Sequence, residues 1–522
     1  MTMKTEPATT SRFLMRRRML GTALCGALGA CGGGSVIALG SDGSGSTTQT
    51  NRALAQLDTL ARSLMTRTGI PGMAVAVVQG GQTVFAQGYG VANVTTQQNV
   101  DADTVFQLAS VSKSLGATVV ASQVGQGSVG WDTPITHLLP GFALSDAAVT
   151  AQLSVGDLYA HRSGLPAHAG DDLEELGYGQ TQVLQRLRYL ALDPFRTTYH
   201  YTNFGLTAAA VGVAAAMGVD WATLSQQAIY EPLGMTRTSS RYTDFAARTN
   251  AAIGHIQLGG KYVPGPLRNA DAQSAAGGAS SSVNDFAKWM SMLLGNGAVG
   301  ERTLIPASAL QPALSQQILS RPASATFPAG YYGFGFNVGQ TDGGRTTFNH
   351  SGAFSTGAST YFMVVPSLNL GFVALTNAAP VGVPETLAYQ FFDLVQYGAI
   401  QQDWLTLIGA QFASLTQPQG ALAGQAPPAS PAPAQPLGNY AGTYANNYFG
   451  ALQVAVQNSA LVLTVGPDNT QYTCTHWSGN VFYFVLPPEV VPGGSRFQVS
   501  FSGQQVTLEY LDAEGAGTFT LV

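Results

Sequence analysis

Two residues three positions apart, Ser110 and Lys113, have the types and spacing of a nucleophile and its base. On a helix, side chains at positions i and i+3 share a face, so the hydroxyl and the amine can meet. A serine hydroxyl becomes a good nucleophile only when a neighbouring group accepts its proton. A lysine can do so where burial lowers the pKa of its amine. The pair therefore predicts a serine nucleophile with a lysine base.

Two later segments add groups of matching chemistry. Tyr201 and Asn203 stand about 90 residues after Ser110; a phenol can relay a proton and an amide can hold a carbonyl. The triplet His350-Ser351-Gly352 follows about 150 residues later, before a strand-like run. There we expect Gly352 to let a ligand approach the backbone, and the N–H of Ala353 to form an oxyanion hole with that of Ser110.

In this order and spacing the three pieces resemble the serine hydrolases related to class C β-lactamases and low-molecular-weight penicillin-binding proteins. The likeness covers about residues 54–397 and includes segments 160–166, 231–235 and 277–279. It implies that Ser110 is acylated, Lys113 accepts its proton and Tyr201 acts as general base or acid. Asn203 would contact the substrate, and His350 would occupy the first position of the Lys-Thr-Gly-like triplet.

His350 departs from the β-lactamase pattern. Most β-lactamases have lysine at this position, where its cation holds the substrate carboxylate, whereas histidine is only partly charged near neutral pH. His-x-Gly is typical of relatives that act as D,D-peptidases, D-aminopeptidases and esterases. The leading hypothesis is thus an esterase or peptidase acting on a small-molecule or short-peptide acyl substrate without a cofactor. The alternatives are a class C-like β-lactamase and a non-catalytic lipoprotein that binds peptidoglycan fragments.

The elements that must position these residues predict an α+β fold. Apolar positions at helical spacing predict helices over 51–68, 112–123, 207–216 and 283–294, the last capped by Ser282. Runs 73–78 and 83–87 flank Gly80-Gly81, and runs 360–365 and 370–376 flank 366–369, which predicts two hairpins. Because strands lie at both ends of a helical middle, we expect them to share one antiparallel sheet flanked by helices. This catalytic domain is expected over residues 53–400.

A second domain follows a proline-rich segment. Residues 401–437 are expected to hold the end of a helix and a linker, because six prolines between 418 and 436 oppose helix and central strand. Beyond it, residues 438–522 alternate apolar and polar positions between turns, which predicts a small all-β barrel. The segments 440–444 and 448–450 resemble the lipocalin-like domain appended to some relatives. We expect its interior to be packed.

The N-terminus predicts export. Four arginines and Lys4 precede a short apolar run, residues 19–30, which is too short to span a bilayer and typical of a signal peptide (residues 1–30). The run ends at Cys31, as in bacterial lipoprotein signals where the cysteine is lipidated; an ordinary cleaved signal is the alternative. Residues 31–52 would form a flexible tether. The predicted location is the periplasm or the outer membrane of a bacterium, with membrane contact through the lipid anchor only.

Composition excludes several other classes. Of 522 residues only 10% are charged and the net charge is −5, so the chain lacks the clustered basic residues of nucleic-acid-binding proteins. With Cys25 in the predicted signal peptide and Cys31 as the predicted lipid site, Cys474 has no partner for a disulfide. No Cys or His spacing indicates a metal site, and the Gly-x-Ser-x-Gly elbow of α/β-hydrolases is absent. Substrate identity and oligomeric state stay open.

Overall fold

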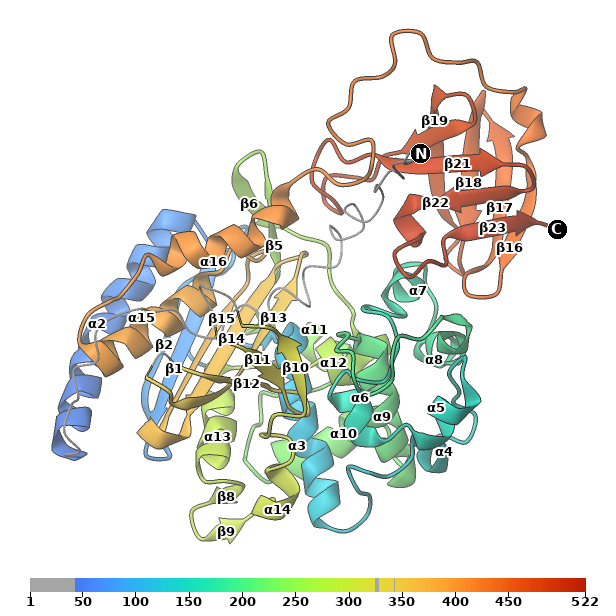
Figure 1. The fold of residues 1–522 in the computed structure, drawn as a ribbon. Coiled ribbons are helices and arrows are strands. Elements are labelled where there is room, and N and C mark those ends of the chain that lie inside the picture. The colour runs from blue at the N-terminus through green and yellow to red at the C-terminus, as the bar shows by residue number, and fades with distance from the viewer. Residues whose placement is uncertain (1–42, 324–327, 342) are drawn as a thin grey trace, which may run out of the picture. The chain divides into compact units, whose positions relative to one another are not determined.

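The computed structural model describes residues 43–323, 328–341 and 343–522 (Figure 1). The predicted signal peptide, Cys31 and most of the predicted tether lie outside these residues. The chain divides after Ala413 into two compact units. The first holds every predicted catalytic and substrate-binding residue, and the second, from Ser414 to Val522, holds the all-β region.

A nine-stranded sheet forms the centre of the first unit, in the order β10-β11-β12-β13-β14-β15-β1-β2-β3. Strands from both ends of the unit meet in it: β1 pairs antiparallel with β15, Met73 opposite Thr376. The prediction of one shared antiparallel sheet is therefore confirmed. The strands are β1 (Gly72–Gln79), β2 (Gln82–Asn93), β3 (Gln98–Asn99), β10 (Ile318–Arg321), β11 (Gly330–Tyr332), β12 (Asn337–Gln340), β13 (Thr346–Phe354), β14 (Ala358–Val365) and β15 (Leu370–Thr376).

Helices cover both faces of this sheet, so its central strands are apolar throughout. Figure 1 shows α2 (Gly43–Thr68) and α15 (Val383–Tyr397) together on one face and α13 (Val283–Leu294) on the other. Phe372 stacks on Phe391 of α15, 5.6 Å between centroids, while Phe362 of the neighbouring strand packs edge-on against Trp289 of α13. Side chains from the two faces of the sheet thus fill two core layers, one against α15 and one against α13.

The region between β3 and β10 is mainly helical, as predicted, and carries the site. Its hydrogen-bonded caps match the sequence at α13, where the Ser282 hydroxyl accepts from the backbone N–H of Asp285. Helix α9 begins at Asn203, four residues before the predicted start. The elements are α3 (Ser112–Gly125), α4 (Ile135–Leu138), α5 (Ala147–Gln152), α6 (Val155–Tyr159), α7 (Asp171–Glu175), α8 (Gln180–Arg186), α9 (Asn203–Ala216), α10 (Trp221–Ser225), α11 (Tyr242–Ala246), α12 (Ser274–Gly277) and α14 (Ala307–Leu310), with the short strands β4 (Phe106–Gln107), β5 (His255–Leu258), β6 (Lys261–Pro264), β7 (Ser280–Ser281), β8 (Ala298–Val299) and β9 (Arg302–Thr303).

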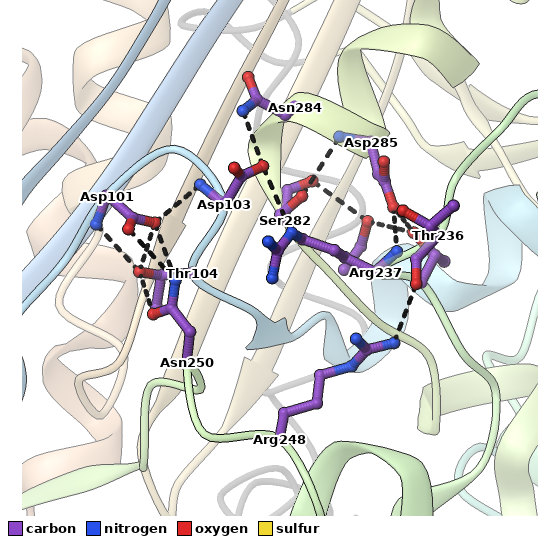
Figure 2. A network of polar contacts seen from close by, with 12 residues as sticks. Asp101, Asp103, Thr104, Thr236, Arg237, Arg248, Asn250, Ser282, Asn284 and Asp285 are labelled. Carbon is purple, nitrogen blue, oxygen red and sulfur yellow. Dashed lines mark hydrogen bonds and ion pairs between the residues drawn. The ribbon is translucent and has the colours of Figure 1, made fainter.

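A polar network holds the segment that leads to Ser110 (Figure 2). The amide of Asn250 donates to Asp101 at 3.0 Å, and that of Asn284 donates to Asp103 at 2.9 Å. Arg237 lies 3.5 Å from the Asp103 carboxylate and donates its backbone N–H to Asp285 at 2.6 Å. Three segments distant in sequence are therefore fixed to one another just before the nucleophile.

The second unit contains a closed eight-stranded barrel, which confirms the predicted all-β fold. Buried aromatic rings pack inside it: Tyr472 stacks on Phe484 at 4.3 Å, and Phe497 meets Tyr510 at 4.8 Å. The strands are β16 (Gly442–Asn446), β17 (Gly450–Gln457), β18 (Ala460–Val465), β19 (Thr470–Ser478), β20 (Val481–Phe484), β21 (Phe497–Ser502), β22 (Gln505–Leu508) and β23 (Thr518–Leu521).

Two segments differ from the sequence prediction. Helix α2 begins at Gly43, within the predicted tether, because Gln49 bonds to the Leu394 carbonyl of α15 and Thr50 is buried. The proline-rich segment is free of strands, but it is not an isolated spacer. The backbone N–H groups of Gln419 and Ala432 donate to hydroxyls of the barrel unit.

Helix α16 (Trp404–Phe412) ends the first unit, and its Trp404 ring stacks on Tyr389 at 4.6 Å. No single helix in the described ranges has both the length and the apolar character needed to cross a bilayer.

Candidate active site

Ser110 lies in a tight turn between β4 and α3. Ala109 before it adopts a left-handed conformation, φ +47°, which is costly for a residue with a Cβ and is often found at functional sites. Residues Ala109–Val111 form a 3₁₀ turn that leads into α3. The turn leaves Ser110 partly exposed while Lys113, one turn later, is fully buried. A substrate can therefore reach the Ser110 hydroxyl, while the Lys113 amine beneath it is shielded from solvent.

Lys113 is the hub of the site. Its Nζ donates to Ser110 Oγ at 3.2 Å, to Asn203 Oδ1 at 2.7 Å and to the Ala276 carbonyl of α12 at 2.9 Å. The same nitrogen lies 4.5 Å from the centroid of the Tyr201 ring. The structure therefore brings together the serine, lysine, tyrosine and asparagine selected from the sequence.

Tyr201 and Asn203 are positioned by the start of α9. Tyr201 is 1% exposed and packs against the His161 ring at 4.5 Å between centroids. Asn203 is the first residue of the helix. His161 accepts the Thr202 N–H at Nδ1, and burial holds the pKa of His161 well below the usual value. Its neutral ring supports Tyr201.

The His350-Ser351-Gly352 triplet lies on β13 at a locally open edge. Strand β12 pairs with residues 346–349 of β13 only, so the stretch that includes Gly352 and Ala353 faces the Ser110 turn on that side. A Cβ at Gly352 would lie 2.1 Å from the Leu108 carbonyl oxygen and 3.1 Å from the Ser110 nitrogen. The strand can approach the nucleophile turn this closely only because residue 352 is glycine.

His350 is fully buried and neutral at physiological pH. Its Nε2 lies 2.9 Å from the Tyr332 hydroxyl and its Nδ1 2.7 Å from the Ser351 carbonyl. Burial, together with the nearby Lys113 cation, lowers the pKa of His350 to about 3. The sequence suggested a partly charged imidazole; here this position supplies no cation.

Sequence reasoning missed three residues of the site. Both carboxyl oxygens of Asp171 accept from the Asn203 amide, and His168 lies 3.0 Å from the same carboxylate. The Tyr332 hydroxyl contacts the His350 ring. None belongs to a recognisable motif. His168 in particular had no informative spacing, because tertiary folding alone brings these residues to the site.

Acidic, histidine and cysteine side chains in the described part of the chain form no group of three that could hold a metal ion.

A family model described as Beta-lactamase matches residues 57–394, which include every site residue described above. The chain belongs to the Beta-lactamase family. A second model, a domain of unknown function named DUF3471, matches residues 426–516 of the barrel unit.

Curated proteins similar to this chain include hydrolases and penicillin-binding proteins. "Unguisins hydrolase ungD" of Aspergillus violaceofuscus is 27% identical over 462 residues, 79% of each chain. "Penicillin-binding protein 4" of Amycolatopsis lactamdurans is 29% identical over 323 residues, 60% of this chain and 83% of that protein.

Solved structures show the same fold. A class C β-lactamase from Rhodobacter sphaeroides superposes with a TM-score of 0.54 at 22% identity, over 66% of this chain and 98% of that one. The octameric penicillin-binding protein homologue from Pyrococcus abyssi superposes with a TM-score of 0.59 at 19% identity, over 87% and 98%.

Proposed function

We propose that this Beta-lactamase family member is a serine hydrolase that forms an acyl-enzyme on Ser110 with neutral ester or amide substrates. The observation that carries the proposal is the 3.2 Å contact between Lys113 Nζ and a partly exposed Ser110 Oγ, inside a shell that buries the amine. A serine activated by a buried base is the arrangement that acyl transfer requires.

The groups present support each proton transfer. Unprotonated Lys113 accepts the Ser110 proton as Oγ attacks the substrate carbonyl, and the backbone N–H groups of Ser110 and Ala353 stabilise the oxyanion. Tyr201, whose ring lies over the Lys113 amine, passes the proton that Lys113 accepted to the leaving alcohol or amine, so that the C–O or C–N bond breaks and the acyl group stays on Ser110 Oγ. A water then attacks the acyl carbon and gives a proton to the same groups; the bond to Oγ breaks, Oγ takes that proton and the acid leaves. Asn203 holds Lys113 and contacts the substrate.

The charge of the site favours esterase, D,D-peptidase or D-aminopeptidase activity over β-lactam hydrolysis. A neutral His350 cannot form an ion pair with a substrate carboxylate, and Asp171 adds a carboxylate close to Asn203. A substrate that carries no anion near its scissile bond suits this field better than a penicillin.

A fluorophosphonate probe tests the nucleophile. Wild type should be labelled on Ser110, and Ser110→Ala should abolish both labelling and hydrolysis of a short-chain nitrophenyl ester. Retained turnover in Ser110→Ala would overturn the mechanism. A panel of nitrophenyl esters, D-amino-acid amides and nitrocefin then ranks substrates, and nitrocefin as the best of them would favour the β-lactamase alternative.

We further propose that the protein is exported and anchored by a lipid on Cys31. The support is the basic and apolar sequence that precedes the cysteine. Metabolic labelling with an alkyne fatty acid should mark the wild type and not Cys31→Ala, while unlabelled wild type in the culture medium would indicate a cleaved signal instead.

A further inference from the structure

The amide of Asn203 is held from both ends. Its Oδ1 accepts from Lys113 Nζ at 2.7 Å, and its Nδ2 lies 3.2 and 3.0 Å from the two oxygens of Asp171. Asp171 is therefore one residue removed from the base of the proposed reaction, and does not itself contact Lys113 through these bonds.

Only one orientation of the amide satisfies both neighbours. Rotating it by 180° would place Nδ2, a donor, against the donor Lys113 and Oδ1, an acceptor, against the Asp171 carboxylate. A carboxylate accepts hydrogen bonds only, so it selects the orientation in which Asn203 presents an acceptor to the base.

Close packing and hydrogen bonds hold Asp171 in place. Gly170 before it has φ +94°, and a Cβ there would lie 2.8 Å from the Phe204 ring on α9. The loop is tied to the tyrosine segment by the His168 backbone N–H, which donates to the Tyr201 carbonyl at 2.8 Å. The His168 ring lies 3.0 Å from the same carboxylate. These contacts fix the position of Asp171 relative to α9.

The charge of Asp171 also acts on Lys113 through this short bridge. Other titratable groups that face the amine come from three elements: Tyr201 before α9, His161 after α6 and His350 on β13, and Lys113 lowers the pKa of both histidines. Glu174 of α7 stands near Asp171 but is bound by Arg268. The Asn203 amide therefore joins the Asp171 carboxylate to the Lys113 amine by two successive hydrogen bonds.

We propose that Asp171 is a positioning residue for the Ser110 reaction: it orients the Asn203 amide and thereby fixes the position of the Lys113 amine. The inference rests on the proposed function, because it assumes that Lys113 is the base. Asp171, the first residue of α7, would thus act on catalysis through Asn203 without touching the substrate.

The test is the rate of fluorophosphonate labelling in a double-mutant cycle. Asp171→Ala should slow labelling by about tenfold to a hundredfold, as expected for a lost hydrogen bond to a charged group. In an Asn203→Ala background Asp171→Ala should slow labelling little further, because the amide through which Asp171 acts on Lys113 is already absent. Glu175→Gln, which removes an exposed carboxylate from the same helix, is the matched control and should label as wild type.

A pH profile separates positioning from folding. Asp171→Asn, which keeps the shape and removes the negative charge, should shift the acidic limb of the labelling rate to lower pH, because a cation forms less readily when a nearby negative charge is lost. An unshifted limb, or an equal slowing by Asp171→Ala with and without Asn203, would overturn the inference. Labelling that survives Ser110→Ala would instead overturn the proposed function, so the two failures are distinguishable.

Discussion

Replacing Glu385 by glutamine should remove a pH-dependent loss of stability from the first unit. Glu385 lies in the first turn of α15, is fully buried and lies close to Ser351 of β13. Neither carboxyl oxygen makes a hydrogen bond of normal length and angle with a described residue. Burial raises the pKa of Glu385 from 4.5 to about 7, although its own backbone N–H and the Ser351 hydroxyl favour the charged form.

The sign and size of the effect follow from linkage. Between pH 4.5 and 7 the folded chain keeps a proton that the unfolded chain has released, so stability is full below pH 4.5 and falls as pH rises to 7. The pKa difference from 4.5 to 7, at 1.36 kcal/mol per unit, gives a loss of about 3 kcal/mol above pH 7. Glutamine does not titrate and should lose nothing by this route.

Urea unfolding followed by tryptophan fluorescence measures the difference. Four of the five tryptophans lie in the first unit, and Trp477 lies in the barrel, so a Trp477→Phe background makes the signal specific to the first unit. The stability of Glu385→Gln relative to its parent should rise by about 3 kcal/mol between pH 4.5 and pH 8. Other titrating groups are common to both proteins and cancel.

A relative stability that stays constant with pH would refute this reasoning, since it would mean that Glu385 ionises as freely in the folded chain as in the unfolded one. A relative stability that falls with pH would show that the folded state favours the carboxylate.

Three further changes test other parts of the site. Lys113→Ala should slow Ser110 acylation by about 10² to 10⁴-fold, measured as the burst rate with a nitrophenyl ester, whereas an unchanged burst would exclude it as the base. Gly352→Ala should abolish the burst, because its Cβ meets the Leu108 carbonyl, while Gly141→Ala, where a Cβ meets nothing within 4 Å, should retain it. The pKa of His350 is about 3 when folded and near 6.5 when unfolded, so the stability of wild type relative to His350→Asn in urea unfolding should fall by about 3 kcal/mol from pH 7 to pH 4. A difference that stays constant with pH would contradict the neutral histidine.

Local signals in the sequence predicted much of the fold and the central groups of the site. Gly80-Gly81 between two apolar runs indicated the hairpin that β1 and β2 form, because positive φ at a turn is a local requirement. Ser110 and Lys113 are neighbours on one turn of chain, so their contact follows from helical spacing alone.

Groups that depend on tertiary packing escaped prediction. Asp171 reaches Asn203 across 32 positions and Tyr332 reaches His350 from another strand, with no periodicity to mark either. The neutral state of His350 likewise follows from burial, which a residue's type does not reveal. The early start of α2 arises from its packing on α15, which overrides a Gly- and Ser-rich composition.

Trapping the intermediate tests the central claim most directly. Wild type mixed with excess nitrophenyl ester and quenched in acid within the burst should yield a peptide that carries one acyl group on Ser110, by tandem mass spectrometry. An acyl group on a different residue, or steady turnover with no acylated peptide at any quench time, would contradict the account.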